Sequence, residues 1–188
     1  MSLAQQKTLN AILYFVKNTK NCRKTKLFKL LYFLDFIHFK KYGTSVTGYD
    51  YIAMPRGPVP IELYEQITNN RMPEEFTKAF SVIEEKDDDD ESKGFKIILK
   101  AKPDMEWFSP NEHQILEEVA FIFKDSTATE ISEITHLKNT PWDRTKNEKG
   151  TNKTIDYFLA LDDETTLARE EIEERFQLQK DLQKNGRL

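Results

Sequence analysis

The three histidines are the residues of this chain best suited to hold a metal ion or to transfer a proton near neutral pH. His38, His113 and His136 are scattered, without i, i+4 pairing and without a neighbouring cysteine. Zinc sites are built from several such ligands at short, regular spacings. The sequence therefore predicts no metal site and no cofactor. We expect His38, which lies in an apolar segment, to be a hydrogen-bonded imidazole of the core.

His136 and Asp143 could also form a catalytic pair around Trp142. His136 would orient a substrate and Asp143 would act as a general base, a chemistry that also needs a pocket and a partner group. We favour a structural role, in which His136 makes a hydrogen bond that fixes the loop to Trp142. A hydrolase built on these two residues is the least favoured alternative, and we predict that the chain is not an enzyme.

Cys22 is the single cysteine and stands in an Asn-Cys-Arg-Lys context. Neighbouring cations would lower the pKa of the thiol, but we expect an exposed cysteine without a catalytic role. The chain also lacks the Gly-x-Ser-x-Gly and Gly-x-x-x-x-Gly-Lys motifs. One cysteine cannot form an internal disulfide, and we see neither a secretory leader nor an apolar run of membrane-spanning length. We therefore expect a cytoplasmic protein with no membrane partner.

Charge is distributed unevenly along the chain. Residues 1–48 carry nine Lys or Arg and one acid, Asp35, a net charge of +8 that leaves −12 on the remainder of a chain whose total is −4. A basic face of this kind could attract nucleic acid. A nucleic-acid-binding or transcription-regulating role is therefore our alternative hypothesis. Solubilising lysines on helix surfaces explain the same pattern, and we favour that interpretation.

The elements that position these residues begin with two helices. Apolar residues recur at helical spacing in residues 4–19, which predicts an amphipathic helix. Residues 26–42 carry two apolar stripes, so we expect a central helix that is buried on more than one side. Thr25 would cap its start and Gly43 would end it.

A small β element is expected next. A strand near residues 49–54 leads into the turn Arg-Gly-Pro-Val-Pro, residues 56–60, which its prolines make stiff. Brief helices should follow, to Ile67 and over residues 73–79. Residues 80–86 and 95–100 predict a β-hairpin. We interpret the acidic residues 87–91 between them as a solvated loop, because calcium loops interleave carboxylates with turn residues.

Two capping boxes, at Ser109 and Thr127, predict helices to about Lys124 and Lys138. Their outline resembles a helix-turn-helix, but the second helix is poor in cations, so we interpret them as an ordinary αα-hairpin. After Trp142 we expect a charged loop, an extended run over residues 155–161 and a charged helical extension over residues 162–188. That extension either packs peripherally or docks a second chain, so a homodimer stays open.

Together these elements predict a mostly helical α+β fold. We expect a single domain over residues 1–188, with about six to seven helices around the central helix. A stiff turn beside an aromatic helix is suited to protein recognition. We predict that four residues lie at a partner-binding surface: Tyr51, Arg56, Pro58 and Val59.

Three segments occur in an order that resembles the SocA-like antitoxin family, also called the Panacea domain. They are Lys-Leu-Leu-Tyr-Phe from residue 29, Arg-Gly-Pro-Val-Pro from residue 56, and Ile-Ser-Glu-Ile-Thr-His from residue 131 with Pro141-Trp142 after it. The resemblance covers roughly residues 10–145. It places Leu30, Leu31 and Tyr32 in the central helix, Gly57, Pro58 and Val59 in the turn, and His136 and Trp142 in the third motif.

The resemblance implies a mostly helical domain with a small β element that neutralises a cognate protein toxin by direct binding, without enzymatic activity. In one mode such a protein is an adaptor that delivers the toxin to a cytoplasmic ATP-dependent protease. The family also holds phage-associated proteins. This chain has Arg56 where an aromatic residue is common, and residues 87–91 and the tail after Asp162 have no counterpart that we can place.

Overall fold

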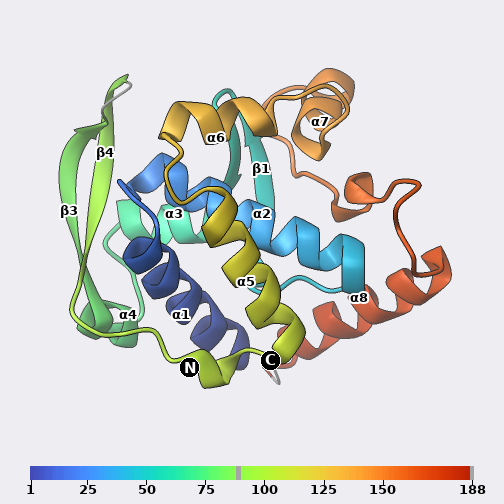
Figure 1. Ribbon diagram of the computed structural model, residues 1–188, viewed down its shortest axis with the longest axis horizontal. Coiled ribbons are helices and arrows are strands. Elements are labelled where there is room, and N and C mark those ends of the chain that lie inside the picture. Colours follow the sequence, from blue (N-terminus) through green and yellow to red (C-terminus); the bar gives the residue numbers. More distant parts are fainter. Residues whose placement is uncertain (88–89, 187–188) are drawn as a thin grey trace.

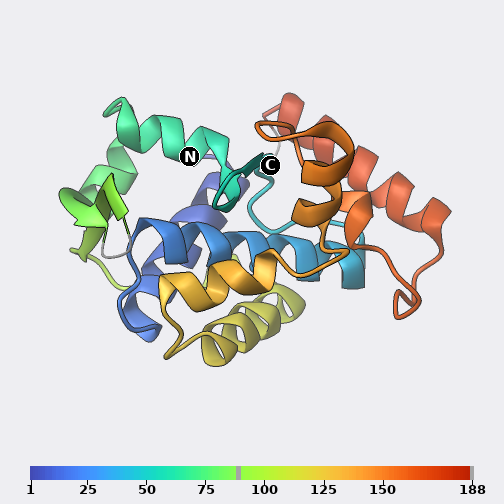
Figure 2. The same ribbon diagram turned by 90° about the horizontal axis from the view of Figure 1, so that it is seen from above.

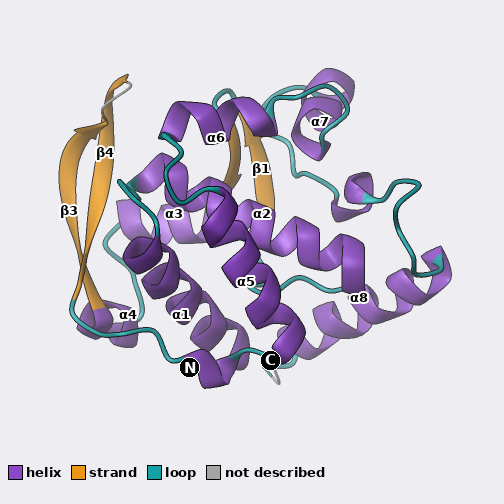
Figure 3. Cartoon of the chain, viewed as in Figure 1, coloured by secondary structure: helices purple, strands orange, loops and turns teal. Residues whose placement is uncertain are grey.

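The computed structural model describes residues 1–87 and 90–186. This part of the chain is mostly helical, with two separate antiparallel hairpins, as the colouring in Figure 3 shows. The predicted α+β class, mostly α, is therefore confirmed. The predicted acidic loop at 87–91 lies partly outside the described residues.

The elements have the following bounds. The α-helices are α1 (Leu3–Asn18), α2 (Lys24–Tyr42), α3 (Ile61–Thr68), α4 (Glu74–Ala79), α5 (Pro110–Ile122), α6 (Ala128–Thr135), α7 (Pro141–Lys149) and α8 (Arg169–Lys184). Two 3₁₀ helices are η1 (Met105–Trp107) and η2 (Tyr157–Ala160). One hairpin pairs β1 (Tyr51–Met54) with β2 (Gly57–Pro60), and the other pairs β3 (Phe80–Asp87) with β4 (Asp90–Leu99).

Helix α2 is the centre of the fold, as its two apolar stripes predict. It packs against helices α1, α5 and α6, strands β2 and β4, and the 3₁₀ helix η2. Figures 1 and 2, at right angles to each other, show these elements around α2. The helix ends at Gly43, whose φ of +75° is left-handed, as predicted. Its N-cap is Arg23, without a side-chain hydrogen bond, so the predicted cap at Thr25 is wrong.

Helices α5 and α6 start at the predicted capping boxes of Ser109 and Thr127 but end earlier than predicted. The buried ammonium of Lys26 on α2 donates hydrogen bonds to the carbonyls of Lys124 and Ser126, 3.3 and 2.7 Å away, which fixes the chain just beyond α5. Ile122, the last residue of α5, is 54% exposed.

Two predictions after Trp142 are wrong. The segment expected as a charged loop is helix α7, which begins with Thr140 as N-cap and Pro141 at the first turn. The segment expected to be extended over residues 155–161 contains η2, where the Asp156 side chain accepts a hydrogen bond from the Phe158 amide. Both elements start with local side-chain caps, which satisfy amides that a loop would leave to water.

The β elements largely follow prediction. The strand expected near 49–54 is β1, and the stiff turn continues into β2, which pairs back with Met54 opposite Gly57. The predicted hairpin at 80–86 and 95–100 is β3 and β4. It stands at one end of the molecule (Figure 1), and the ring of Phe95 packs edge-on against Phe28 of α2.

Helix α8 packs on its own chain through a narrow apolar stripe. Ile172 is fully buried, and the Phe176 ring lies 5.0 Å from that of Phe39 on α2, measured between centroids. Farther along, the Gln179 side chain accepts from the Ser45 amide at 2.9 Å and donates to the Ser45 carbonyl at 2.7 Å. These contacts hold α8 against the loop that follows α2.

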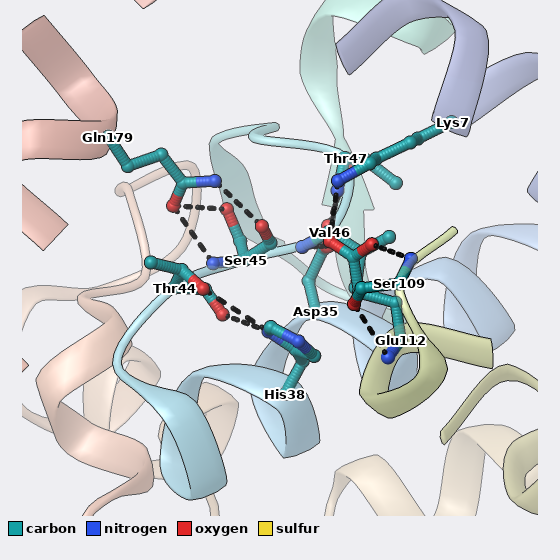
Figure 4. Close-up of polar contacts among 10 residues, drawn as sticks. All are labelled: Lys7, Asp35, His38, Thr44, Ser45, Val46, Thr47, Ser109, Glu112 and Gln179. Atoms are coloured by element: carbon teal, nitrogen blue, oxygen red, sulfur yellow. Dashed lines mark hydrogen bonds and ion pairs between the residues drawn. The ribbon is translucent and has the colours of Figure 1, made fainter. Parts of the chain in front are cut away.

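That loop, residues 44–47, is fixed by α2 from the other side (Figure 4). Asp35 accepts hydrogen bonds from the amides of Val46 and Thr47, both at 2.8 Å, and from the Thr47 hydroxyl. Nδ1 of the buried His38 lies 2.6 Å from the Thr44 carbonyl and donates to it. His38 is therefore the satisfied core imidazole that the sequence predicts.

Candidate partner-binding site

The three sequence motifs meet on one side of α2. Lys29 lies on α2, Arg56 and Gly57 form the turn between β1 and β2, and His136 and Trp142 follow α6 and open α7. Strand β2 packs against α2 and α6, and α7 packs against β1. In Figure 2, α6 runs alongside α2. Segments more than 20 residues apart in the sequence thus form one structural unit.

Lys29 is buried beneath the turn. Its side chain is 2% exposed, and its ammonium donates a hydrogen bond to the Pro58 carbonyl at 2.9 Å. Burial, together with the charge of Lys24, lowers the pKa of Lys29 to about 7. A lysine in this position is close to losing its charge at neutral pH, because an ammonium is poorly stabilised away from water.

Gly57 allows the turn to approach Lys29 closely. A Cβ built on Gly57 would lie 2.6 Å from Cε and 2.9 Å from Nζ of Lys29, and 2.9 Å from Oγ1 of Thr135. Gly57 also has a φ of +106°, a backbone conformation that residues with a side chain rarely adopt. Because Gly57 has no side chain, the turn can pack directly against Lys29 of α2 and Thr135 at the end of α6.

Trp142 ties α7 to the same hairpin. Its indole Nε1 donates to the Met54 carbonyl at 2.9 Å, and the His136 ring stacks on the indole with centroids 4.0 Å apart. The predicted hydrogen bond from His136 to the loop of Trp142 is therefore replaced by ring stacking. The ammonium of Lys146 lies over the indole, 4.8 Å from its centroid.

The surroundings of His136 favour the uncharged form of its imidazole. Desolvation lowers the pKa of His136, the charges of Lys29 and Lys146 lower it further, and the Arg56 backbone and Glu133 oppose the shift. Within the described part of the chain, Nε2 of His136 is buried and has no hydrogen-bond partner. Such orphaned atoms are rare in folded proteins.

An open pocket of about 300 Å³ lies between the start of α2, the turn and α6, and we call it the turn pocket. Arg56 and Glu133 are exposed, and Pro55 completes the turn side. The lining residues are Thr25, Pro55, Arg56, Ala128, Thr129, Ser132, Glu133 and His136.

The four residues that the sequence assigns to a partner surface differ in their exposure to solvent. Arg56 is exposed and Val59 is half-buried. Pro58 is buried and its carbonyl accepts from Lys29. Tyr51 is fully buried, and its hydroxyl donates to Asp35 at 2.7 Å, so its assignment to the surface is wrong. The motif residues Leu30, Leu31 and Tyr32 are core residues, and the Tyr32 hydroxyl faces the Trp142 backbone.

Sequence reasoning missed the role of Lys29 and of Thr135, which is also fully buried. A signal was present for the lysine. Lys26 and Lys29 are one helical turn apart within a segment that is otherwise apolar, and a lysine there must find acceptors inside the fold.

Two residues considered for catalysis, Asp143 and Cys22, have structural surroundings. Asp143 accepts hydrogen bonds from the Asn139 amide and the Asn147 side chain, both at 2.9 Å, so its carboxylate serves the start of α7. Cys22 is buried, and burial raises its pKa to about 11, so the expected exposed and activated thiol is wrong. Across residues 1–87 and 90–186, no three His, Cys, Asp or Glu side chains gather as metal ligands would. None of the described helices has the length and apolarity to cross a membrane.

Most cations of the basic N-terminal segment have partners within the same chain. Lys26 and Lys29 are buried. Five more of its nine cations form ion pairs with acids from later segments, and the pair Lys7–Glu112, at 2.7 Å, appears in Figure 4 beside Ser109. The others are Lys20–Asp125, Arg23–Glu85, Lys40–Asp162 and Lys41–Glu118. Because these cations are buried or already paired with acids, the charge asymmetry gives little support to a nucleic-acid interface.

Comparison with known proteins identifies the family. The model of the family described as antitoxin SocA-like, Panacea domain, matches residues 27–143. This span runs from α2 into α7 and contains all three motifs. No curated protein and no solved structure gives a significant match. The chain belongs to the SocA-like antitoxin family.

Proposed function

We propose that this protein is an antitoxin that binds a cognate protein toxin directly and neutralises it without enzymatic chemistry. The observation that carries the proposal is the convergence of the three family motifs around Lys29. Their shared outer side is the surface formed by the turn, α6 and the start of α7, which we call the turn surface.

The turn surface is preformed. The turn is held from below by Lys29, from the side by Trp142, and from behind by residues 152–155, because the Ala53 amide donates to the Lys153 carbonyl at 2.8 Å. A partner would therefore bind without first ordering the loop. A preorganised surface of this kind loses less entropy on binding, which favours affinity.

The turn surface also has groups suited to anchoring a partner. Arg56 is exposed on the turn, and Ile134 and Leu137, near the end of α6, are 39% and 59% exposed. Protein interfaces of ordinary size bury about 1,600 Å² and depend on a few aromatic, aliphatic or Arg anchors. The turn pocket alone is smaller than this, so we place Ile134 and Leu137 within the same interface.

The proposal is tested by co-expressing the chain with the product of the adjacent reading frame. We expect rescue of growth and co-elution of the two proteins. Arg56→Glu and Leu137→Asp should weaken both, whereas Arg71→Glu, at an exposed arginine away from the turn surface, should not. Persistent growth arrest together with failure to co-elute would overturn the proposal.

The same experiment separates binding from delivery to a protease. If the protein neutralises by occupancy, the amount of toxin in rescued cells stays constant. If it acts as an adaptor for an ATP-dependent protease, the toxin becomes short-lived only when the antitoxin and the protease are both present.

A further inference from the structure

We propose that the protein forms a symmetric dimer in which helix α8 of each copy docks into a pocket beside α7 of the other copy. Both the pocket and the helix face that fills it belong to this chain, so the dimer does not depend on the proposed toxin.

The pocket lies between the connection from α6 to α7 and the segment that follows η2, and we call it the α7 pocket. It is open to solvent and has a volume of about 550 Å³. Leu137, which is 59% exposed, lines it. Apolar side chains that gather at one open pocket indicate a binding surface, whereas isolated ones do not. The apolar lining residues are Leu137, Pro141, Leu159, Ala160 and Leu161.

Both walls of the α7 pocket are held in place. On one wall, the Thr140 hydroxyl donates to the Thr135 carbonyl at 2.7 Å, which fixes the connection between α6 and α7. On the other wall, the Lys40 ammonium of α2 donates to Asp162 at 2.7 Å. The Phe158 ring of η2 also packs against a ring of α2, with centroids 5.2 Å apart. The pocket is therefore formed before a partner arrives, so binding loses less entropy.

The polar lining of the α7 pocket is cationic. Lys138 is exposed, and its ammonium forms no hydrogen bond or ion pair within residues 1–87 and 90–186. Arg144 is paired with Glu148 at 3.8 Å, which is beyond hydrogen-bond range. The acid of the lining, Asp162, is already paired with Lys40. The pocket therefore favours an apolar side chain that has an acidic neighbour.

Helix α8 carries that combination on its outer face. Glu174, Leu178 and Leu182 are each four residues apart, so they lie along one face of the helix, which we call the α8 ridge. Leu178 is 61% exposed. Glu174 is also exposed, and its carboxylate has no partner in the part of the chain that the structure describes. Phe176, which packs on the core, is two residues from Leu178 and so lies on the opposite side of the helix.

The α7 pocket and the α8 ridge belong to the same part of the molecule. Figures 1 and 2 both show α7 and α8 away from the hairpin of β3 and β4, toward the opposite end. A two-fold axis on that side places the ridge of each copy at the pocket of the other, so every contact occurs twice. Leu178 then fills the apolar lining, and Glu174 pairs with Lys138.

The test is sedimentation velocity of the purified full-length protein from micromolar to millimolar concentrations. We expect a reversible monomer–dimer equilibrium that weakens as salt is added, because the ion pairs are screened. Leu178→Asp and Leu137→Asp should each weaken the dimer by about tenfold or more, since each leucine is lost from two contacts. Ile83→Asp is the matched control, because Ile83 is 48% exposed on the distant hairpin, and it should leave the dimer unchanged.

A charge swap tests the pairing of Glu174 with Lys138. Lys138→Glu and Glu174→Lys should each weaken the dimer. The two substitutions in one chain should restore it, because the pair then forms with its charges exchanged. Lys102→Glu changes another exposed lysine by the same amount and should have no effect. All of these side chains are exposed, so circular dichroism should show that each variant folds.

Three results would overturn the proposal. The first is a protein that stays monomeric at millimolar concentration. The second is a dimer that Leu178→Asp leaves intact, since the copies would then meet at another surface. The third is a pocket used by the toxin alone: Leu137→Asp would abolish toxin binding, while Leu178→Asp would change neither the assembly nor the binding.

Discussion

The ammonium group of Lys29 lies directly beneath Gly57, at a distance that leaves no space for a side chain on the turn. A Cβ on Gly57 would be 2.9 Å from Nζ and 2.6 Å from Cε. The same ammonium donates to the next carbonyl, that of Pro58. The motif on α2 and the motif in the turn are therefore two halves of one packing arrangement, which explains why they occur together in the sequence.

Gly57→Ala should destabilise the protein by about 1–3 kcal/mol from backbone strain alone, with a further loss from the contact with Lys29. Gly150→Ala is the matched control, because Gly150 also has a positive φ, +88°, but has no neighbouring atom within 4 Å of a Cβ. The free energy of unfolding of both variants, measured in urea, separates the cost of backbone strain from the cost of the steric clash with Lys29. Equal destabilisation by the two substitutions would contradict the packing role.

Tyr51→Phe should lower the free energy of unfolding by about 1.5–3 kcal/mol, since it removes a buried hydrogen bond to a carboxylate. The Tyr51 hydroxyl donates to Asp35, which also accepts from the loop after α2. Because the ring is fully buried, toxin affinity per folded molecule should stay unchanged. A variant of normal stability with weakened toxin binding would return Tyr51 to the interface.

The central helix and its partners could be predicted because their apolar residues follow the helical period, and capping boxes identified the starts of α5 and α6. Helix α7 could not be predicted in this way. After Trp142 its residues are Asp, Arg, Thr, Lys, Asn, Glu and Lys, so it has no apolar period, and only Thr140 and Pro141 indicate its start.

The site was harder to predict than the fold, because its residues depend on contacts between distant segments. The acceptor of Lys29 is 29 residues away in the sequence. Cys22 has cationic neighbours along the chain, yet packing buries it and raises its pKa. Tyr51 was assigned to the surface because it adjoins the stiff turn, but the partner of its hydroxyl, Asp35, lies on the central helix.

The buried Lys29 should make stability depend on pH above neutrality. Its pKa falls from 10.5 in the unfolded chain to about 7 in the fold, so between these values the unfolded chain binds more protons. The free energy of unfolding contributed by this group therefore rises with pH, by at most about 1.4 kcal/mol per unit.

The measurement compares urea unfolding of the wild type and Lys29→Met between pH 7 and 10. The wild type should gain stability relative to the variant as the pH rises, because the cost of burying the ammonium is relieved. Lys17→Met controls for loss of one lysine at an exposed site. A constant difference between wild type and Lys29→Met across this range would show that Lys29 keeps its charge in the fold.

The stacking of His136 on Trp142 should make indole emission a direct measure of His136 ionisation. An imidazolium in contact with an indole quenches its fluorescence, and the two ring centroids are 4.0 Å apart. In a Trp107→Phe background, emission should fall as the pH is lowered, with a midpoint below 6.5. The midpoint is displaced downward because desolvation, Lys29 and Lys146 lower the pKa of His136 more than Glu133 and the Arg56 backbone raise it. His136→Gln should abolish the transition, and Lys146→Gln should move the midpoint upward. A midpoint above 6.5 in the unliganded protein would mean that the acidic neighbour prevails over the two lysines.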